Sequence, residues 1–123
     1  MSNPLLVSVV DDDESVRESL PDLLREFGFE VQAFSSAEDF LASGHVDATH
    51  CLVLDIAMPG MSGPDLQRKL TVRGYNIPII FITAHGDAAD LPQLIRQGAV
   101  DCLLKPFSEA ALLRALNAAL PAA

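Results

Sequence analysis

Polar residues that can bind a metal ion or a phosphate group come directly after four short apolar runs of the chain. They are Asp11, Asp12 and Asp13 after the first run, Asp55 after the third, Thr83 after the fourth, and Lys105 after the fifth. Close carboxylates repel each other unless a cation or a proton neutralises them. Mg²⁺ prefers oxygen ligands and is commonly held by one or two carboxylates together with phosphate oxygens. The acids therefore predict a Mg²⁺ site, provided that the fold brings them together.

The same set of residues suits the transfer of a phosphoryl group. An ionised aspartate such as Asp55 can attack phosphorus and form an acyl phosphate. Lys105 would place a positive charge against one phosphoryl oxygen, and the hydroxyl of Thr83 would donate a hydrogen bond to another. Positioning and charge neutralisation supply most of the catalysis of such a transfer. We therefore predict that Asp55 accepts a phosphoryl group.

Five short apolar runs, rich in Val, Ile and Leu, are typical of buried parallel strands. They cover residues 5–10, 31–34, 51–54, 77–82 and 102–104. Amphipathic segments separate them, most clearly where Val16, Leu20, Leu23, Leu24 and Phe27 recur at helical spacing. Strands that alternate with helices form parallel sheets through right-handed crossovers. The pattern predicts a doubly wound α/β fold with five strands and five helices, in which ligands bind at the carboxyl ends of the strands.

Two serines predict the first residues of helices. Ser35, with Glu38 three residues later, has the arrangement of a capping box. Ser108 is in a suitable place to cap the last helix.

Composition limits the class of protein. The 123 residues are half apolar and contain no repeat or linker, which favours a single domain over residues 1–123. With 17 acidic and 8 basic residues the net charge is -9, which disfavours direct binding to nucleic acid. No apolar run approaches the roughly 20 residues of a membrane span, and no signal peptide is recognisable. We expect a soluble, cytoplasmic protein in which Cys51 and Cys102 act as small hydrophobic residues.

Four stretches resemble the receiver domains of bacterial two-component response regulators, so that the resemblance covers nearly the whole chain. They are VVDDDESVR at 9–17, LDIAMPGMSG at 54–63, FITAHGD at 81–87 and GAVDCLLKPF at 98–107. The second and third stretches look like those of the FixJ-type branch. The resemblance implies a flavodoxin-like, CheY-like sheet with the strand order 2-1-3-4-5.

The resemblance also implies a role for each polar residue. Asp55 would be the phosphoacceptor, Thr83 the hydroxyl that moves on phosphorylation, and Lys105 the cation that contacts the phosphoryl group. The peptide bond between Lys105 and Pro106 would be cis, a form that is accessible mainly before proline. The ligands of Mg²⁺ would be Asp11, Asp12, Asp55 and the backbone carbonyl of Ala57.

Partners follow from the same resemblance. A sensor histidine kinase would supply the phosphoryl group, and a downstream output domain or a target protein would receive the signal. The fourth helix, fifth strand and fifth helix would form the output face or a phosphorylation-dependent homodimer. Both a stand-alone regulator and the receiver part of a longer transcription factor fit the sequence. Receivers commonly carry Tyr or Phe where this chain has Cys102, so we expect the loop 84–90 and the fourth helix to carry the signal instead.

Two other functions compete with the switch. A phosphatase of the haloacid-dehalogenase type would need a second Asp two residues after the nucleophile, where this chain has Ala57. A degenerate receiver that only binds partners would usually lack the acidic pair, the acceptor or the lysine, and all three are present. We therefore expect a signalling domain that promotes its own phosphorylation and slow dephosphorylation, and not an enzyme with an outside substrate.

Overall fold

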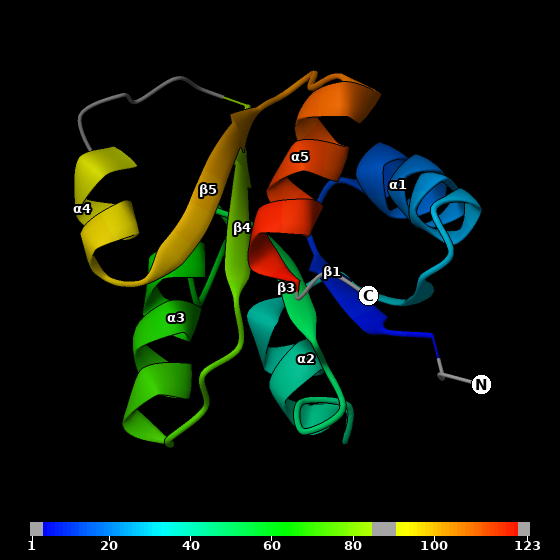
Figure 1. The fold of residues 1–123 in the computed structure, drawn as a ribbon. Helices are drawn as coiled ribbons and strands as arrows, with labels where there is room; N and C mark the ends of the chain where they lie inside the picture. The colour runs from blue at the N-terminus through cyan, green and yellow to red at the C-terminus, as the bar shows by residue number, and fades with distance from the viewer. Residues whose placement is uncertain (1–3, 85–90, 121–123) are drawn as a thin grey trace.

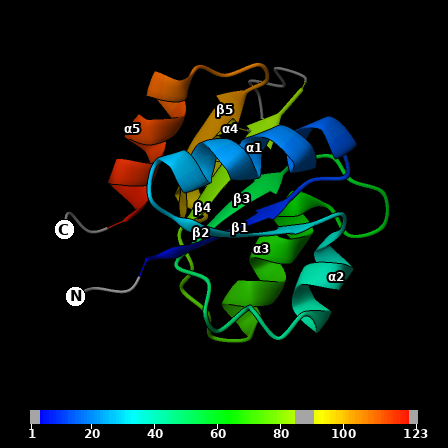
Figure 2. The same ribbon diagram turned by 90° about the vertical axis from the view of Figure 1, so that its right-hand side faces the viewer.

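The computed structural model describes residues 4–84 and 91–120, and within these ranges five parallel strands form one sheet (Figures 1 and 2). The strand order is β2-β1-β3-β4-β5, as the resemblance implies. The strands are β1 (Leu6–Val10), β2 (Glu30–Phe34), β3 (Cys51–Asp55), β4 (Ile79–Thr83) and β5 (Ala99–Leu104). The predicted α/β fold with a five-stranded parallel sheet is confirmed.

A helix follows each strand, and the helices cover both faces of the sheet (Figures 1 and 2). They are α1 (Glu14–Glu26), α2 (Ala37–Ala42), α3 (Gly63–Val72), α4 (Leu91–Arg96) and α5 (Glu109–Ala119). None of these helices is long and apolar enough to cross a membrane.

The core consists of two apolar clusters, one on each face of the sheet. Val9 and Val53 face the cluster that also contains the buried residues of α1 and α5. Their neighbours Val10 and Leu54 face the cluster that contains buried apolar side chains of α2, α3 and α4. Successive side chains of a strand point to opposite faces. Burial on both faces therefore explains why these strands are continuous apolar runs in the sequence.

Several predicted boundaries differ from the observed ones; β4, for example, begins at Ile79, two residues after the predicted start. Ser36, and not Ser35, caps α2: its Oγ accepts a hydrogen bond from the backbone N–H of Asp39 at 3.0 Å. The strand β5 begins at Ala99, three residues before the predicted start, with a register irregularity opposite Ile79 and Ile80. The predicted cap at Ser108 is confirmed, because its Oγ accepts from the N–H of Ala111 at 3.0 Å.

The two cysteines are free thiols, as expected. Cys51 is buried in β3, and burial raises the pKa of its thiol to about 12. Cys102 is half-buried in β5, and β4 lies between the two strands.

Candidate functional site

Three carboxylates meet at the carboxyl edge of the sheet. β1 and β3 are neighbouring parallel strands in which Val10 lies opposite Leu54, so the next residues, Asp11 and Asp55, extend from the same edge. One carboxylate oxygen from each of Asp11, Asp12 and Asp55 lies within 4.8 Å of the others. Asp11 is fully buried and Asp55 is 5% exposed, whereas Asp12 is exposed.

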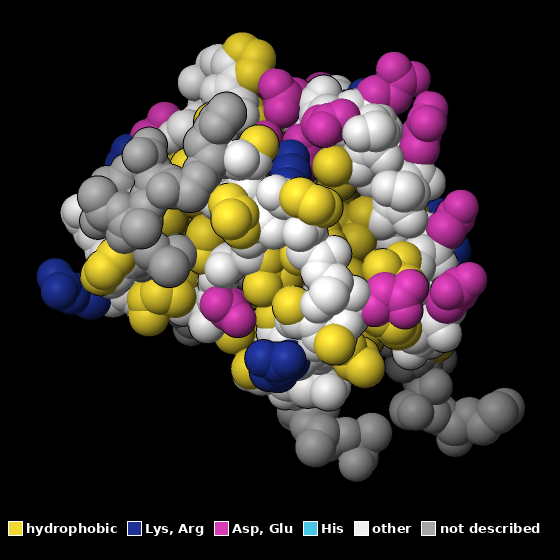
Figure 3. All heavy atoms as spheres, turned by 90° about the horizontal axis from the view of Figure 1, so that it is seen from above, with side chains coloured by type: hydrophobic (Ala, Val, Ile, Leu, Met, Phe, Trp, Pro, Cys, Tyr) yellow, Lys and Arg dark blue, Asp and Glu magenta, His cyan; other side chains and the backbone are white. Residues whose placement is uncertain are grey.

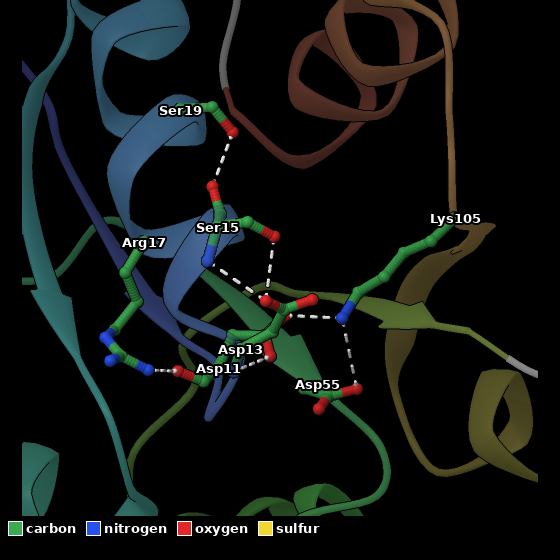
Figure 4. A network of polar contacts seen from close by, with 7 residues as sticks. All are labelled: Asp11, Asp13, Ser15, Arg17, Ser19, Asp55 and Lys105. Carbon is green, nitrogen blue, oxygen red and sulfur yellow. Dashed lines mark hydrogen bonds and ion pairs between the residues drawn. The ribbon is translucent and has the colours of Figure 1, made fainter.

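Lys105 enters the same cluster from the segment after β5. Its Nζ lies 2.7 Å from Asp11 Oδ2 and 3.9 Å from Asp55 Oδ1 (Figure 4). Its backbone N–H donates to the carbonyl of Thr83 at 2.7 Å, which joins the ends of β4 and β5. The Lys105–Pro106 peptide bond is cis, as the resemblance implies. The lysine therefore points into the acidic cluster and is only 15% exposed there.

The charges in this cluster are not balanced by the lysine alone. Burial, together with the negative charge of Asp11, raises the pKa of Asp55 to about 7, although Lys105 opposes the shift. Burial by itself would lower the pKa of Lys105, but the carboxylates of Asp11 and Asp55 raise it overall. A cation is therefore the natural neutraliser of the remaining charge. The donor set of three carboxylates matches the preference of Mg²⁺ for hard oxygen ligands.

The turn between β1 and α1 holds Asp11 in place. Asp11 Oδ1 accepts from the N–H of Asp13 at 2.9 Å, and the Asp11 carbonyl accepts from Arg17 Nη1 at 2.9 Å (Figure 4). Asp13 caps α1, because its Oδ1 accepts from the N–H and the hydroxyl of Ser15. These hydrogen bonds lower the pKa of Asp13. Asp13 therefore serves the helix start, and Asp11 and Asp12 supply the acids of the cluster.

Thr83 and Ala57 also lie at this edge of the sheet. Thr83 is the last residue of β4 and is half-buried. Ala57 is exposed, two residues after Asp55 on the segment that leads to α3.

The hypothesis that the loop 84–90 carries the signal concerns residues 85–90, which lie outside the described residues. Arg17 was not predicted to contact the acidic turn, because the partner of so long a side chain depends on tertiary structure.

Comparison with known proteins decides the family. A family model for the response regulator receiver domain matches residues 7–117, which is most of the chain. The chain belongs to the response regulator receiver domain family. Such receiver domains are signalling domains of phosphorylation-dependent two-component systems, not classical enzymes. Mg²⁺ binding at an acidic pocket is typical of them.

Individual relatives support the assignment of this receiver domain. Nodulation protein W of Bradyrhizobium diazoefficiens is 49% identical over 118 residues, which cover 96% of this chain and 52% of that protein. The structure of response regulator StyR is 50% identical with a TM-score of 0.87, covering 97% of this chain and 60% of that one. The structure of FixJ-N is 40% identical with a TM-score of 0.84, covering all of both chains. The chain spans about half the length of the curated relatives it matches.

A glycine lets α3 of the receiver domain approach the phosphoacceptor candidate. A Cβ atom on Gly63 would lie 2.4 Å from the carbonyl oxygen of Asp55 and 3.0 Å from a ring carbon of Phe81. The backbone N–H of Gly63 donates a hydrogen bond of 3.0 Å to the carbonyl of Ile56. Ser62 caps α3 in a capping box with Asp65. The start of α3 is therefore packed directly against the backbone that carries Asp55.

The surface around the site is acidic and hollowed. Acidic side chains gather near a basic one where the molecule is viewed from above in Figure 3. A hollow of about 500 Å³ runs beside the receiver domain's acidic cluster, between α1 and the segment after β5. Among its lining residues are Val16, Leu20, Lys105 and Phe107. Lys105 can thus be approached from outside through an apolar groove.

Proposed function

We propose that Asp55 accepts a phosphoryl group from a sensor histidine kinase in a reaction that requires Mg²⁺. The observation that carries this proposal is the position of Lys105 Nζ, which lies beside Asp11 and Asp55 in a cluster of three carboxylates. A structural ion pair would need one acid and one base. The two further carboxylates leave a net negative charge that a divalent cation would neutralise, and Lys105 and that cation together would then attract a phosphoryl group.

The ligands of Mg²⁺ would be Asp11, Asp12, Asp55 and the backbone carbonyl of Ala57. Bound there, the cation neutralises charge on the carboxylates and on the phosphoryl oxygens. Burial of Asp11 and Asp55 makes these two ligands rigid, and the exposed Asp12 leaves one side of the cluster open to solvent. An open side suits Mg²⁺, which keeps several waters when it binds to proteins.

The transfer itself forms one bond and breaks one. A carboxylate oxygen of Asp55 attacks phosphorus, and the bond from phosphorus to the imidazole nitrogen of the kinase's phosphohistidine breaks. That nitrogen leaves with the bonding electrons. Lys105 contacts one phosphoryl oxygen, and the hydroxyl of Thr83 donates to another. The apolar groove beside α1 leads to Lys105 and gives the kinase a surface on which to dock.

The product is expected to persist long enough to act as a signal. Rapid hydrolysis would need a positioned acid or base near the acyl phosphate. The residue two positions after Asp55 is Ala57, which has no such group. This residue favours the switch over a phosphatase, and the retained acids and lysine favour it over a degenerate binding module.

The output surface is proposed to be the face formed by α4, β5 and α5. Ile95, Leu104 and Leu113 are large apolar side chains on these elements, and each is at least 39% exposed. Phosphorylation would change how this face contacts an output domain, a target protein or a second copy of the chain. Sedimentation velocity with and without acetyl phosphate measures the dimer directly.

Intact-mass spectrometry tests the proposal. Incubation with acetyl phosphate and MgCl₂ should add one phosphoryl group, and EDTA should prevent the addition. Asp55→Asn should abolish it, whereas Asp22→Asn should keep it because Asp22 is an exposed acid that pairs with Arg25 on α1. A full gain of mass by the Asp55→Asn protein would exclude Asp55 as the acceptor.

A further inference from the structure

We infer that Arg17 is a positioning residue that fixes the Asp11–Asp12 turn for binding of Mg²⁺. The inference rests on the proposed function of the site. Arg17 lies on α1, and its side chain turns back toward the end of β1 (Figure 4). Its Nη1 donates a hydrogen bond of 2.9 Å to the backbone carbonyl of Asp11, in a half-buried position.

The carbonyl that Arg17 binds belongs to the peptide group between Asp11 and Asp12. The other polar groups of Asp11 are bound as well. Its N–H donates to the carbonyl of Phe34 at 3.1 Å, Oδ1 accepts from the N–H of Asp13, and Oδ2 lies beside Lys105. Arg17 therefore supplies the contact that sets the plane of the peptide leading into Asp12.

The orientation of this peptide matters most for Asp12. Asp11 and Asp55 are buried and are held by surrounding atoms, whereas Asp12 is exposed. An exposed side chain is not held by packing, so the direction of its carboxylate depends on the backbone from which it starts. A fixed peptide plane keeps the Asp12 carboxylate close to those of Asp11 and Asp55 before the cation binds.

The partner of Arg17 also distinguishes it from the other arginines with a described contact. Arg25 and Arg68 each pair with an exposed acid three residues earlier on the same helix, Asp22 and Asp65 respectively. Arg17 instead binds a backbone carbonyl and leaves the carboxylate oxygens of the cluster to the cation. Groups that hydrogen-bond to the metal-ligating residues, without touching the metal themselves, commonly control the affinity for the metal.

Two effects of Arg17 on Mg²⁺ binding have opposite signs. Its positive charge near the acids repels a cation, so charge alone predicts that Arg17→Gln strengthens binding. Its hydrogen bond orients the ligands, so positioning predicts that the same change weakens binding. Arg17→Lys separates the two effects because it keeps the charge but replaces the planar guanidinium with a shorter point charge.

Isothermal titration calorimetry of the whole chain with MgCl₂ tests the inference. Arg17→Gln should weaken Mg²⁺ binding by about tenfold, and Arg17→Lys should weaken it by about threefold. Arg25→Gln is the matched variant, because it removes the same charge from the same helix at a site outside the cluster, and its affinity should equal that of the wild type. Circular dichroism shows whether each variant is folded. If Arg17→Gln does not fold, the Arg17→Lys protein decides the question.

The possible failures can be told apart. A wild-type chain that binds no Mg²⁺ refutes the proposed function, and the role of Arg17 with it. A wild type that binds Mg²⁺, together with an Arg17→Lys protein of equal affinity or an Arg17→Gln protein of equal or higher affinity, refutes the inference alone.

Discussion

Lys105 Nζ lies 2.7 Å from Asp11 Oδ2 but 3.9 Å from Asp55 Oδ1. The lysine is therefore held mainly by the fully buried Asp11 and lies farther from the phosphoacceptor candidate. A phosphoryl group on Asp55 would bring new oxygens within reach of the same ammonium group. In the proposed function, the ion pair with Asp11 would thus keep Lys105 in position for the phosphoryl group.

Replacing Lys105 should lower the rate of phosphorylation strongly and should change the affinity for Mg²⁺ little. Lys105→Met removes the cation that we propose contacts a phosphoryl oxygen, so the rate with acetyl phosphate should fall by roughly 100-fold. Mg²⁺ should still bind, because the three carboxylates remain. Stopped-flow or quenched mass spectrometry gives the rate, and calorimetry gives the affinity. Equal rates for the variant and the wild type would exclude a direct contact between Lys105 and the phosphoryl group.

Removing the charge of Asp55 should stabilise the metal-free protein above neutral pH. Folding raises the pKa of Asp55 from 3.8 to about 7, so the folded state disfavours the ionised form. The folded state is therefore favoured by the protonated form of Asp55. This contribution to the free energy of unfolding is complete below about pH 4 and is lost as the pH rises through about 7. At pH 8 in EDTA, Asp55→Asn should raise the free energy of unfolding by about 2 kcal/mol.

Urea unfolding at several pH values measures this effect. The advantage of Asp55→Asn should shrink as the pH falls and should disappear near pH 4. Asp22→Asn, which changes an exposed acid outside the cluster, is the matched control. An advantage of Asp55→Asn that was the same at pH 4 and pH 8 would show that the ionisation of Asp55 is not its source.

Mg²⁺ should stabilise the wild type through the same carboxylates. A ligand that binds only the folded state at about 100 times its Kd adds about 2.7 kcal/mol to the free energy of unfolding. Asp12→Asn should lose most of this gain, and because Asp12 is exposed the change should leave the core intact. Thermal unfolding with MgCl₂ or EDTA provides the measurement. A full Mg²⁺ response in the Asp12→Asn protein would remove Asp12 from the ligand set.

Gly63→Ala should damage both stability and phosphorylation. The added Cβ would meet the carbonyl oxygen of Asp55 at 2.4 Å, and relief of that contact requires movement of the backbone. We expect a loss of about 2 kcal/mol in the free energy of unfolding. Gly28→Ala provides a comparison, because its Cβ would meet no atom within 4 Å and only its positive φ of 99° causes strain.

Gly28→Ala should therefore lose about 1 kcal/mol of stability and keep the wild-type rate of phosphorylation. Denaturant unfolding and the rate with acetyl phosphate should be measured for both glycine variants. If both variants lost phosphorylation to the same extent, the close approach of α3 to Asp55 would not explain the effect.

The site residues could be predicted from the sequence where the ends of strands determine their position. Asp11, Asp55 and Lys105 each follow a buried apolar run, and parallel strands bring their carboxyl ends to one edge. The strand order came from the family resemblance, because an alternation of strands and helices does not determine which strands are neighbours. Thr83 could be placed at the same edge for the same reason, as the last residue of β4.

Predictions failed where several local signals competed. Ser35 and Ser36 each precede an acid by three residues, and only the backbone of the folded chain makes Ser36 the cap. Asp101 interrupts the apolar pattern of β5, which hid the true start of the strand at Ala99. The contact of Arg17 with Asp11 joins two elements through a long side chain, and no spacing in the sequence predicts it.

Chemical mapping of the phosphorylated residue is the most direct test of the site. The chain should be incubated with acetyl phosphate and MgCl₂, reduced with borohydride, digested and sequenced by tandem mass spectrometry. Reduction converts an aspartyl phosphate to homoserine, and we predict this product at position 55 alone. Homoserine at another aspartate, or none in a sample that carries one phosphoryl group, would contradict the assignment of Asp55 as the acceptor.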